Sequence, residues 1–172
     1  NGNTSGSITI EAPAVAGTNT ITLPASSGTL ATTATAGKVL QVVGVTYAIS
    51  TSTASATMVT TGLTASITPS SISSKILVIA NVNGARTAAT FTGVKVQLYK
   101  DASAIQTPQY YASYSTTSED TQSCIPFCYL DSPATTSSIT YTMYFNRNVG
   151  SGTVSVQANN SASTITLMEI AA

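Results

Sequence analysis

The feature that most limits how this chain can fold is an alternation of apolar and polar residues at every second position. It is strictest over residues 92–100 (TGVKVQLYK), where Val94, Val96 and Leu98 would share one side of an extended chain. The same alternation returns over residues 138–146 (SITYTMYFN). A period of two is typical of a β-strand with one buried face, and no segment shows the 3.6-residue period of an amphipathic helix. The pattern therefore predicts an all-β protein.

Downstream of residue 37, such segments recur at short intervals with turn-forming residues between them. Residues 75–82 (KILVIANV) are apolar on both sides of the chain, which predicts a central strand. Roughly eight strands at this spacing favour an antiparallel β-sandwich, and within that class long cross-connections favour a jelly roll. The immunoglobulin sandwich is disfavoured, because the chain has no tryptophan and no widely spaced cysteine pair.

Glycines predict local irregularities in these strands. Gly44 predicts a bulge or bend within a strand over residues 39–49, and Gly62 predicts a break within residues 57–68. The dipeptide Asn83-Gly84 is typical of a tight hairpin turn. We therefore expect the central strand to end at this dipeptide.

The first part of the chain differs because its strand-like pieces are too short to bury a core. Residues 7–10 (SITI) and 20–23 (TITL) alternate, and residues 31–37 (ATTATAG) have the small side chains of a linker. We predict a domain boundary at this linker. An N-terminal β arm would cover residues 1–37, and the β-sandwich residues 38–172.

Strands as short as those of the arm are not stable alone. Three copies wound about a common axis would bury the arm's apolar side chains against one another, and closed symmetric assembly is the usual outcome for such contacts. The arm is therefore expected to trimerise and to attach the protein, through Ile8, Ile10, Ile21 and Leu23.

The chain has few side chains that could act in catalysis. Charged residues make up 7% of it, against roughly 25% in typical soluble proteins, and its net charge is +0, so we expect no surface for nucleic acid or anionic lipid. It has no histidine, which excludes a Ser-His-Asp or Cys-His arrangement. No apolar run has the length that spans a membrane, and no signal-like segment follows Asn1. We expect no catalytic residues, no cofactor, no metal and no membrane insertion.

The acidic residues allow one catalytic alternative. Glu119 and Asp120 are adjacent and could act as a carboxylate pair in glycoside hydrolysis, but their polar surroundings favour the tip of a solvated loop. Asp131 lies just before a serine and a proline, which predicts an Asx-turn.

Two further features have alternative interpretations. Glu169 lies among apolar neighbours, so it must face water at the surface or pair with a base such as Lys38 or Arg147. Cys124 and Cys128 are expected to be buried free thiols, the alternative being a disulfide closed by a turn between them.

Tyrosines supply the candidate contact surface. Tyr110, Tyr111 and Tyr114 cluster in a segment rich in glutamine and serine, and tyrosine combines a flat ring with a polar tip. Together with Arg86 they are candidates for a receptor-facing surface that binds a glycan or a protein. Packing of a sandwich face or of a subunit contact is the alternative.

Several segments of the sequence resemble those of one protein family. Residues 62–84 (GLTASITPSSISSKILVIANVNG), 129–145 (YLDSPATTSSITYTMYF) and 163–172 (STITLMEIAA) are similar to the recurrent C-terminal domain of tail-fibre and other virion surface proteins of marine bacteriophages. Residues 18–43 (TNTITLPASSGTLATTATAGKVLQVV) are similar to the segment that precedes this domain.

The resemblance implies a non-enzymatic virion structural protein, displayed on the particle surface as a homotrimeric fibre or knob used in host attachment. Its partners would be further copies of itself, other virion proteins held by the N-terminal arm, and a host surface glycan or protein. For a fibre that contacts the host, the contact is expected through loops around residues 86–91, 106–119 or 146–151.

Two other functions stay open. The chain shows no recognisable tail-adaptor domain, which leaves a capsid decoration protein that coats or stabilises the head as the alternative. A cellular adhesin or extracellular filament subunit is the third.

Overall fold

The computed structural model describes residues 38–117 and 120–172, with the backbone alone at residues 108–111. Within these residues the chain forms ten β-strands and one short 3-10 turn, η1 (Ala158–Asn160), so the predicted all-β class is confirmed. The predicted arm over residues 1–37 lies outside the described residues. The strands are β1 (Val39–Tyr47), β2 (Thr51–Thr53), β3 (Val59–Ile67), β4 (Lys75–Thr87), β5 (Thr92–Lys100), β6 (Ser103–Ser115), β7 (Thr121–Asp131), β8 (Ile139–Val149), β9 (Val154–Val156) and β10 (Ser163–Ile170).

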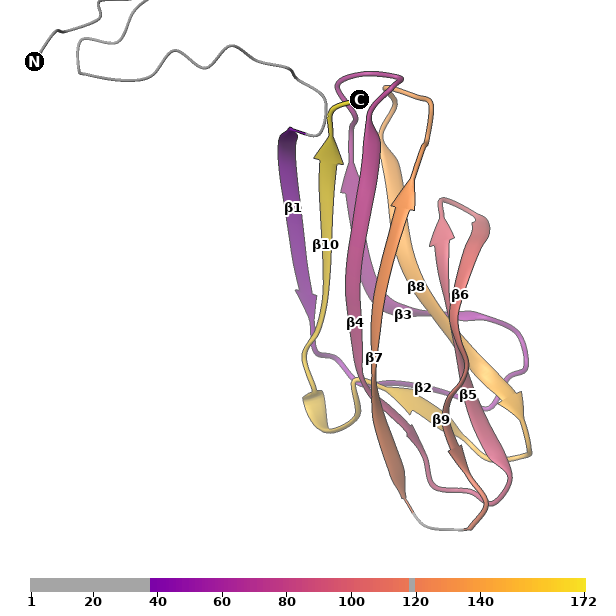
Figure 1. The fold of residues 1–172 in the computed structure, drawn as a ribbon. Coiled ribbons are helices and arrows are strands. Elements are labelled where there is room, and N and C mark those ends of the chain that lie inside the picture. Colours follow the sequence, from indigo (N-terminus) through magenta and orange to yellow (C-terminus); the bar gives the residue numbers. More distant parts are fainter. Residues whose placement is uncertain (1–37, 118–119) are drawn as a thin grey trace, which may run out of the picture. The chain divides into compact units, whose positions relative to one another are not determined.

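Two antiparallel sheets pack face to face as a sandwich (Figure 1). Sheet A holds β1, β10, β4 and β7 in that order, and β9 and β2 extend it beside the last residues of β4. Sheet B holds β3, β8, β5 and β6. Counted inward from both ends of the chain, β1 pairs with β10, β3 with β8, β4 with β7, and β5 with β6. This nested pairing in two sheets is a jelly roll, as the sequence predicted.

The nested pairing separates the connections into two opposite ends of the sandwich. At the end that we call the near end, the chain enters at Lys38, whose carbonyl accepts a hydrogen bond from the Ala171 N–H (2.9 Å). Strand β4 also begins there, because Lys75 lies opposite Ile170. The connections that follow β1, β4, β6 and β8 therefore lie at the other end, the far end (Figure 1).

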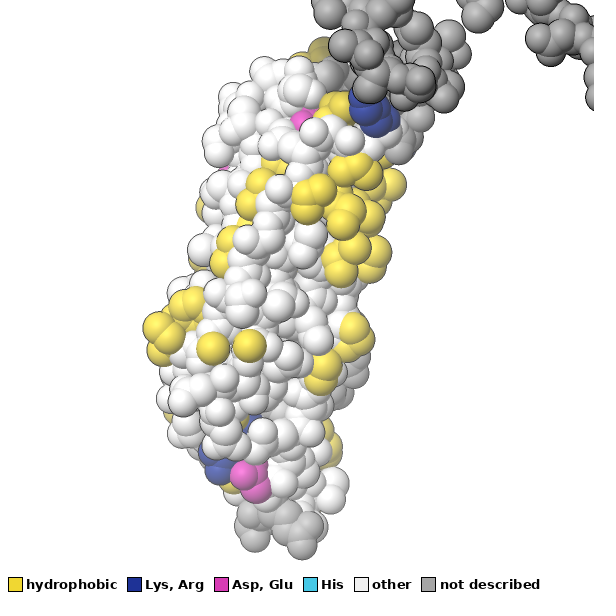
Figure 2. All heavy atoms as spheres, turned by 90° about the vertical axis from the view of Figure 1, so that its left-hand side faces the viewer, with side chains coloured by type: hydrophobic (Ala, Val, Ile, Leu, Met, Phe, Trp, Pro, Cys, Tyr) yellow, Lys and Arg dark blue, Asp and Glu magenta, His cyan; other side chains and the backbone are white. Residues whose placement is uncertain are grey.

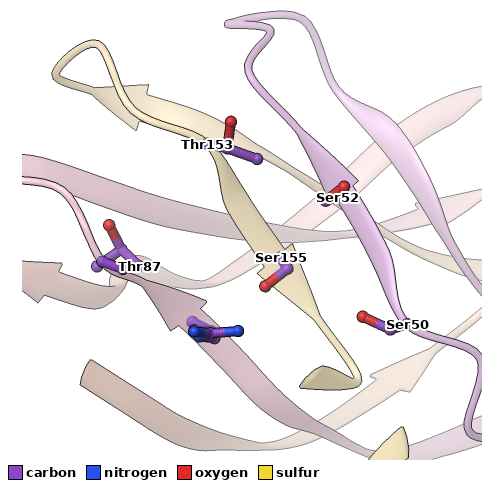
Figure 3. A pocket seen from close by; sticks show the side chains of 7 residues that line it. Ser50, Ser52, Thr87, Thr153 and Ser155 are labelled. Carbon is purple, nitrogen blue, oxygen red and sulfur yellow. The ribbon is translucent and has the colours of Figure 1, made fainter. Parts of the chain in front are cut away.

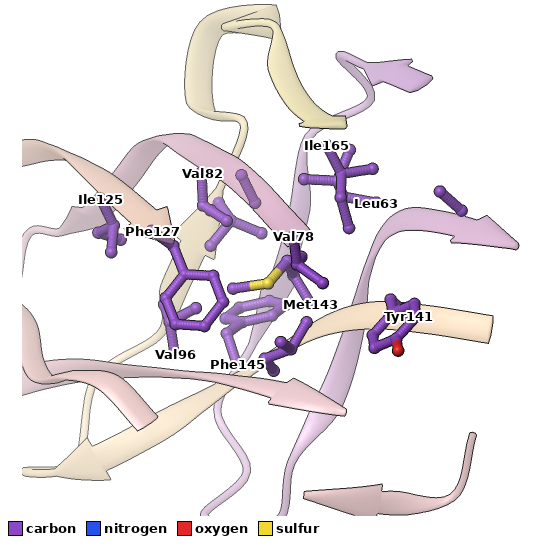
Figure 4. Packing of buried hydrophobic residues seen from close by; sticks show 14 of the residues in the cluster. Leu63, Val78, Val82, Val96, Ile125, Phe127, Tyr141, Met143, Phe145 and Ile165 are labelled. Atoms are coloured by element: carbon purple, nitrogen blue, oxygen red, sulfur yellow. The ribbon is translucent and has the colours of Figure 1, made fainter. Parts of the chain in front are cut away.

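The core lies between the two sheets, where the alternating strands place their apolar residues. Val94, Val96 and Leu98 of β5 are fully buried, as their alternation predicted. Figure 4 shows Phe127 and Phe145 projecting into the same space from the two different sheets. Burial of side chains of this size contributes about 1.5–3 kcal/mol each, so the sandwich holds its own hydrophobic core.

Of the three irregularities predicted from glycines, the break at Gly62 is present, whereas the bulge at Gly44 and the turn at Asn83-Gly84 are not. Gly62 does interrupt the register of β3, with a φ of +81°. Gly44, by contrast, lies in regular pairing with Thr166, and the irregularity of β1 falls between Val39 and Gln41. The predicted bulge at Gly44 is therefore wrong.

The predicted turn at Asn83-Gly84 is also wrong, because β4 continues through this dipeptide to Thr87. Gly84 has a φ of +61°, as in a tight turn, but here it forms a bulge where the register with β7 shifts between Val82 and Ala85. The turn does not form because both edges of β4 are occupied by neighbouring strands. The positive φ is used instead to bring the chain close to η1.

Candidate binding surfaces

The surface of the sandwich is mostly neutral. Figure 2 shows neutral polar atoms over most of one side, with hydrophobic side chains gathered in its upper part and few charged ones. The described residues contain no helix that could cross a bilayer, and no group of three or more histidine, cysteine, aspartate or glutamate side chains placed to hold a metal ion. The sites of interest are therefore polar hollows, apolar faces and buried carboxylates.

Asp131 is a buried structural residue, so the predicted Asx-turn is wrong. It ends β7 and accepts hydrogen bonds from the Lys100 Nζ (3.0 and 3.2 Å) and the Tyr141 Oη (2.6 Å). Burial, followed by the hydrogen bond to Asp131, raises the pKa of Tyr141. Because strands β5 and β8 bring both partners to Asp131, its neighbours in sequence did not reveal them.

Glu169 is fully buried on β10, which contradicts the expectation that it faces water or pairs with a base. Its carboxylate accepts hydrogen bonds from the Gln41 Nε2 (2.6 Å), the Ser70 N–H (2.7 Å) and the Ser70 hydroxyl (2.6 Å). Burial alone would raise the pKa of Glu169, but these hydrogen bonds outweigh it and lower the pKa to about 2. Neutral donors thus hold a buried charge in place of Lys38 or Arg147.

Cys124 and Cys128 are free, as expected, but they are exposed rather than buried. Residues alternate along β7, and Ile125 and Phe127 take the positions that face the core. Both thiols therefore lie on the outer side of sheet A, and the Cys124 thiol donates to the Asn81 Oδ1 (2.9 Å).

A hollow of about 320 Å³ lies at the far end, over β2, β9 and the last residues of β4. It is built by pairing, because Ser52 of β2 lies opposite Ser155 of β9, and Ser155 lies opposite Arg86 of β4. Figure 3 shows Ser50 and Ser52 on one side of this hollow, with Thr153 and Ser155 on the neighbouring strand. We call it the hydroxyl hollow, lined by Ser50, Ser52, Arg86, Thr87, Ala88, Thr153 and Ser155.

Of the described residues that line the hydroxyl hollow, Arg86 alone is charged, and its charge is compensated. Its Nε donates to the Asp120 Oδ1 (2.8 Å), and the two side chains are 39% and 42% exposed. This hydrogen bond and the attraction between the charges raise the pKa of Arg86. Hydroxyls both donate and accept hydrogen bonds, whereas a guanidinium only donates. The hollow therefore suits a neutral polar ligand with several hydroxyl or carbonyl groups.

The two residues of the predicted receptor-facing surface whose side chains are described belong to different sheets. Arg86 belongs to sheet A and lines the hydroxyl hollow, while Tyr114 belongs to β6 of sheet B, where it lies opposite Gly93 and is 42% exposed. Both lie toward the far end. Tyr110 and Tyr111 are part of β6, and their side chains lie outside the described atoms. The predicted arm contacts also lie outside the described residues: Ile8, Ile10, Ile21 and Leu23.

Of the three segments expected to contact the host, residues 86–91 and 146–151 include the β4–β5 and β8–β9 connections at the far end. Residues 106–115 belong to β6, so the expectation of a loop is wrong there. The serines of the hydroxyl hollow were missed. Their alternation in TST and VSV indicates exposed hydroxyls, but only the pairing of β2 with β9 brings them together.

No family model and no curated protein matches the chain. Similar solved structures include VP2 of infectious bursal disease virus in a subviral particle, with a TM-score of 0.41 and 15% identity over 76% of this chain and 38% of that chain. Another is the Gx strain of the same virus, with a TM-score of 0.42 and 19% identity over 87% of this chain and 43% of that chain. The chain thus spans about two fifths of the length of these proteins. Both similarities are distant, and they concern the fold alone.

Proposed function

We propose that this chain is a non-enzymatic structural protein of a bacteriophage virion, a homotrimeric surface fibre or knob that takes part in host attachment. The resemblance of residues 62–84, 129–145 and 163–172 to virion surface proteins supports the virion role. The scarcity of charged residues and the lack of histidine in the sequence support a role without catalysis.

The observation that carries the attachment role is the division of the sandwich into two ends. The chain enters at Lys38 at the near end, while the hydroxyl hollow lies at the far end. A protein held to a particle through the segment before Lys38 would direct its far end outward. The hydroxyls and Arg86 of the hollow suit a host surface glycan, and the exposed ring of Tyr114 offers a second contact for a glycan or a protein.

In this proposal, the N-terminal arm over residues 1–37 joins the copies of the chain and holds the trimer to other virion proteins. Four apolar residues of the arm would form the contacts along the common axis: Ile8, Ile10, Ile21 and Leu23.

The test locates the protein in intact particles of the phage that encodes it, by labelling with a gold-conjugated antibody against the full chain. We expect label on tail fibres or on surface knobs, with copy numbers in multiples of three. The purified full-length protein should bind host cells and compete with the phage for them. A trimer that neither binds host cells nor slows infection would contradict the attachment role.

The same labelling separates the alternative function. Label spread over the head at its symmetry axes, with particles that lose robustness when the protein is absent, would favour capsid decoration. Absence of label from the particle would overturn the virion role and would favour a cellular adhesin or extracellular filament subunit.

A further inference from the structure

The outer side of sheet A is apolar across four neighbouring strands. Register places Val42 of β1 opposite Met168 of β10, Met168 opposite Leu77 of β4, and Leu77 opposite Leu130 of β7. In the next row, Ile79 lies opposite Cys128. We call this surface the outer apolar face, and it consists of Val42, Leu77, Ile79, Cys128, Leu130 and Met168.

These side chains are accessible in the single chain. Val42 is 57% exposed, Leu130 50% and Ile79 42%. Beside them, a shallow depression of about 450 Å³ runs over β10, β4 and β7, and its lining includes Ile79, Cys128 and Thr166. A contiguous apolar surface with a hollow next to it is typical of an interaction site.

The outer side of sheet B has a different character. Hydroxyl groups pair across β3 and β8, with Thr64 bound to Thr142 and Ser66 to Thr140, both at 2.8 Å. These hydroxyl groups bind one another and are exposed, so this side is suited to solvent. Of the two outer sides, sheet A is the one whose exposure to water is unfavourable.

The charges of the outer apolar face favour another copy of this chain as its partner. Among the outward positions of β1, β10, β4 and β7 that the structure describes, two are charged: Lys75 at the near end of the sheet, and Arg86 at the far end, where it pairs with Asp120. Neither belongs to the outer apolar face. An acidic or basic partner would have to desolvate its charges without compensation. A second neutral, apolar face meets no such penalty, and each copy of the chain carries one.

The area of the outer apolar face indicates how much of a stable interface it could form. Strands are about 4.8 Å apart and residues on one side of a strand about 6.8 Å apart, so four strands over two rows cover on the order of 260 Å². A standard interface buries roughly 800 Å² per partner. The face would supply about a third of a stable contact, and a second region must supply the rest.

We infer that the outer apolar face is the sandwich-to-sandwich contact between copies of this chain, turned toward the threefold axis of the assembly. The inference rests on the proposed homotrimer for its symmetry, and the N-terminal arm is the second region. It places β4 and β10 next to the axis and leaves the outer side of sheet B accessible, while the hydroxyl hollow lies on sheet A beyond the face, at the far end.

Cys124 and Cys128 make this contact measurable in the full chain, because both thiols lie on the outer side of sheet A. A maleimide reagent should label Cys128 in the wild-type assembly at least about tenfold more slowly than in a Val42→Glu variant, where the buried charge opens the contact. Val42 lies on β1 at the other edge of the four-stranded row, so the substitution does not touch the thiols.

A matched control is Ile49→Glu, which places the same charge on an exposed apolar residue outside the face, 66% accessible in the single chain. It should label like the wild type. Circular dichroism melting verifies that both variants fold, and sedimentation equilibrium gives the mass of each assembly relative to the 17.5 kDa chain.

The outcomes separate this inference from the proposed function. If the wild-type protein is a trimer whose Cys128 thiol is labelled as fast as in Val42→Glu, the outer apolar face is not the contact. The trimer would then be held together by other surfaces. A dimer with protected thiols would support the contact and overturn the trimer. A monomer at micromolar concentration would overturn both.

Discussion

At the level of single residues, the described part of the chain buries two carboxylates, although the sequence has few charges. Asp131 is held by Lys100 and Tyr141, and Glu169 by Gln41 and Ser70. A buried charge without partners would cost several kcal/mol, so these donors decide whether the acids stabilise the sandwich. Both acids serve to fix the positions of neighbouring strands and connections.

Replacing Glu169 tests this role. Glu169→Gln keeps the size but removes the charge that the donors of Gln41 and Ser70 require, so we expect the free energy of unfolding at neutral pH to fall by about 1–3 kcal/mol. Urea denaturation measures it. The matched control Asp120→Asn removes a carboxylate from a half-exposed ion pair and should leave the stability nearly unchanged.

The same residue predicts a dependence of stability on pH. The pKa of Glu169 is lowered from 4.5 to about 2 in the folded chain, so its contribution is fully present above pH 4.5 and is lost as the pH falls toward 2. Wild-type protein should lose more stability over this range than Glu169→Gln. Equal losses in the two proteins would contradict the charged, hydrogen-bonded state of Glu169.

A third prediction at this scale concerns the hydroxyl hollow. Ser52 is exposed on β2, so Ser52→Tyr should fill the hollow without disturbing the core. If the hollow binds the host glycan, we expect at least about a tenfold loss of binding to host cells, measured by flow cytometry with labelled full-length protein. Ser137→Tyr, an exposed position at the near end, is the control and should bind normally.

At the level of elements, two glycines that both lie inside strands have different roles because of their packing. A Cβ at Gly84 would lie 2.5 Å from the backbone nitrogen of Ala158, whereas a Cβ at Gly44 would meet nothing within 4 Å. Gly84 also has a φ of +61°, which L-residues rarely adopt. The first glycine is therefore required by the fold, and the second is not.

This difference gives a paired prediction. Gly84→Ala should lower the free energy of unfolding by about 1–3 kcal/mol, through backbone strain and displacement of η1. Gly44→Ala should change it by less than about 0.5 kcal/mol. Thermal unfolding of the two variants side by side measures both. Equal melting temperatures would show that β4 tolerates a side chain at its bulge.

The strands themselves could be predicted well, because a strand with one buried face has a period of two that is visible in the sequence. The alternation over residues 92–100 matches β5 at both ends. The dipeptide Asn83-Gly84 misled because its local preference for positive φ is compatible with a bulge as well as a turn. Which of the two forms depends on whether neighbouring strands continue past it.

At the scale of the whole molecule, the sandwich has two unlike outer sides and two unlike ends. One side is apolar and the other carries paired hydroxyls, while one end receives the chain at Lys38 and the other holds the hydroxyl hollow. This asymmetry underlies both the proposed attachment role and the inferred contact between copies.

Removing the N-terminal arm tests whether the sandwich folds without it and whether the arm is needed for attachment to the particle. The buried core lies within residues 38–172, so a chain without residues 1–37 should fold to a sandwich with a cooperative melting transition. We expect it to be absent from particles when it is mixed with virions that lack the full-length protein, as measured by co-sedimentation. Docking of the shortened protein would show that the arm is not the anchor.

Residue types and local alternation were enough to predict the all-β class, the run of strands and the inward apolar positions, because each of these depends on residue type or on neighbours two positions apart. Other features depend on the folded arrangement of the strands: the partners of Glu169 and Asp131, the exposure of Cys124 and Cys128, the hydroxyl hollow and the outer apolar face. These arise where strands distant in sequence lie side by side. Pairing register, which is a long-range property, sets which side chains share a row.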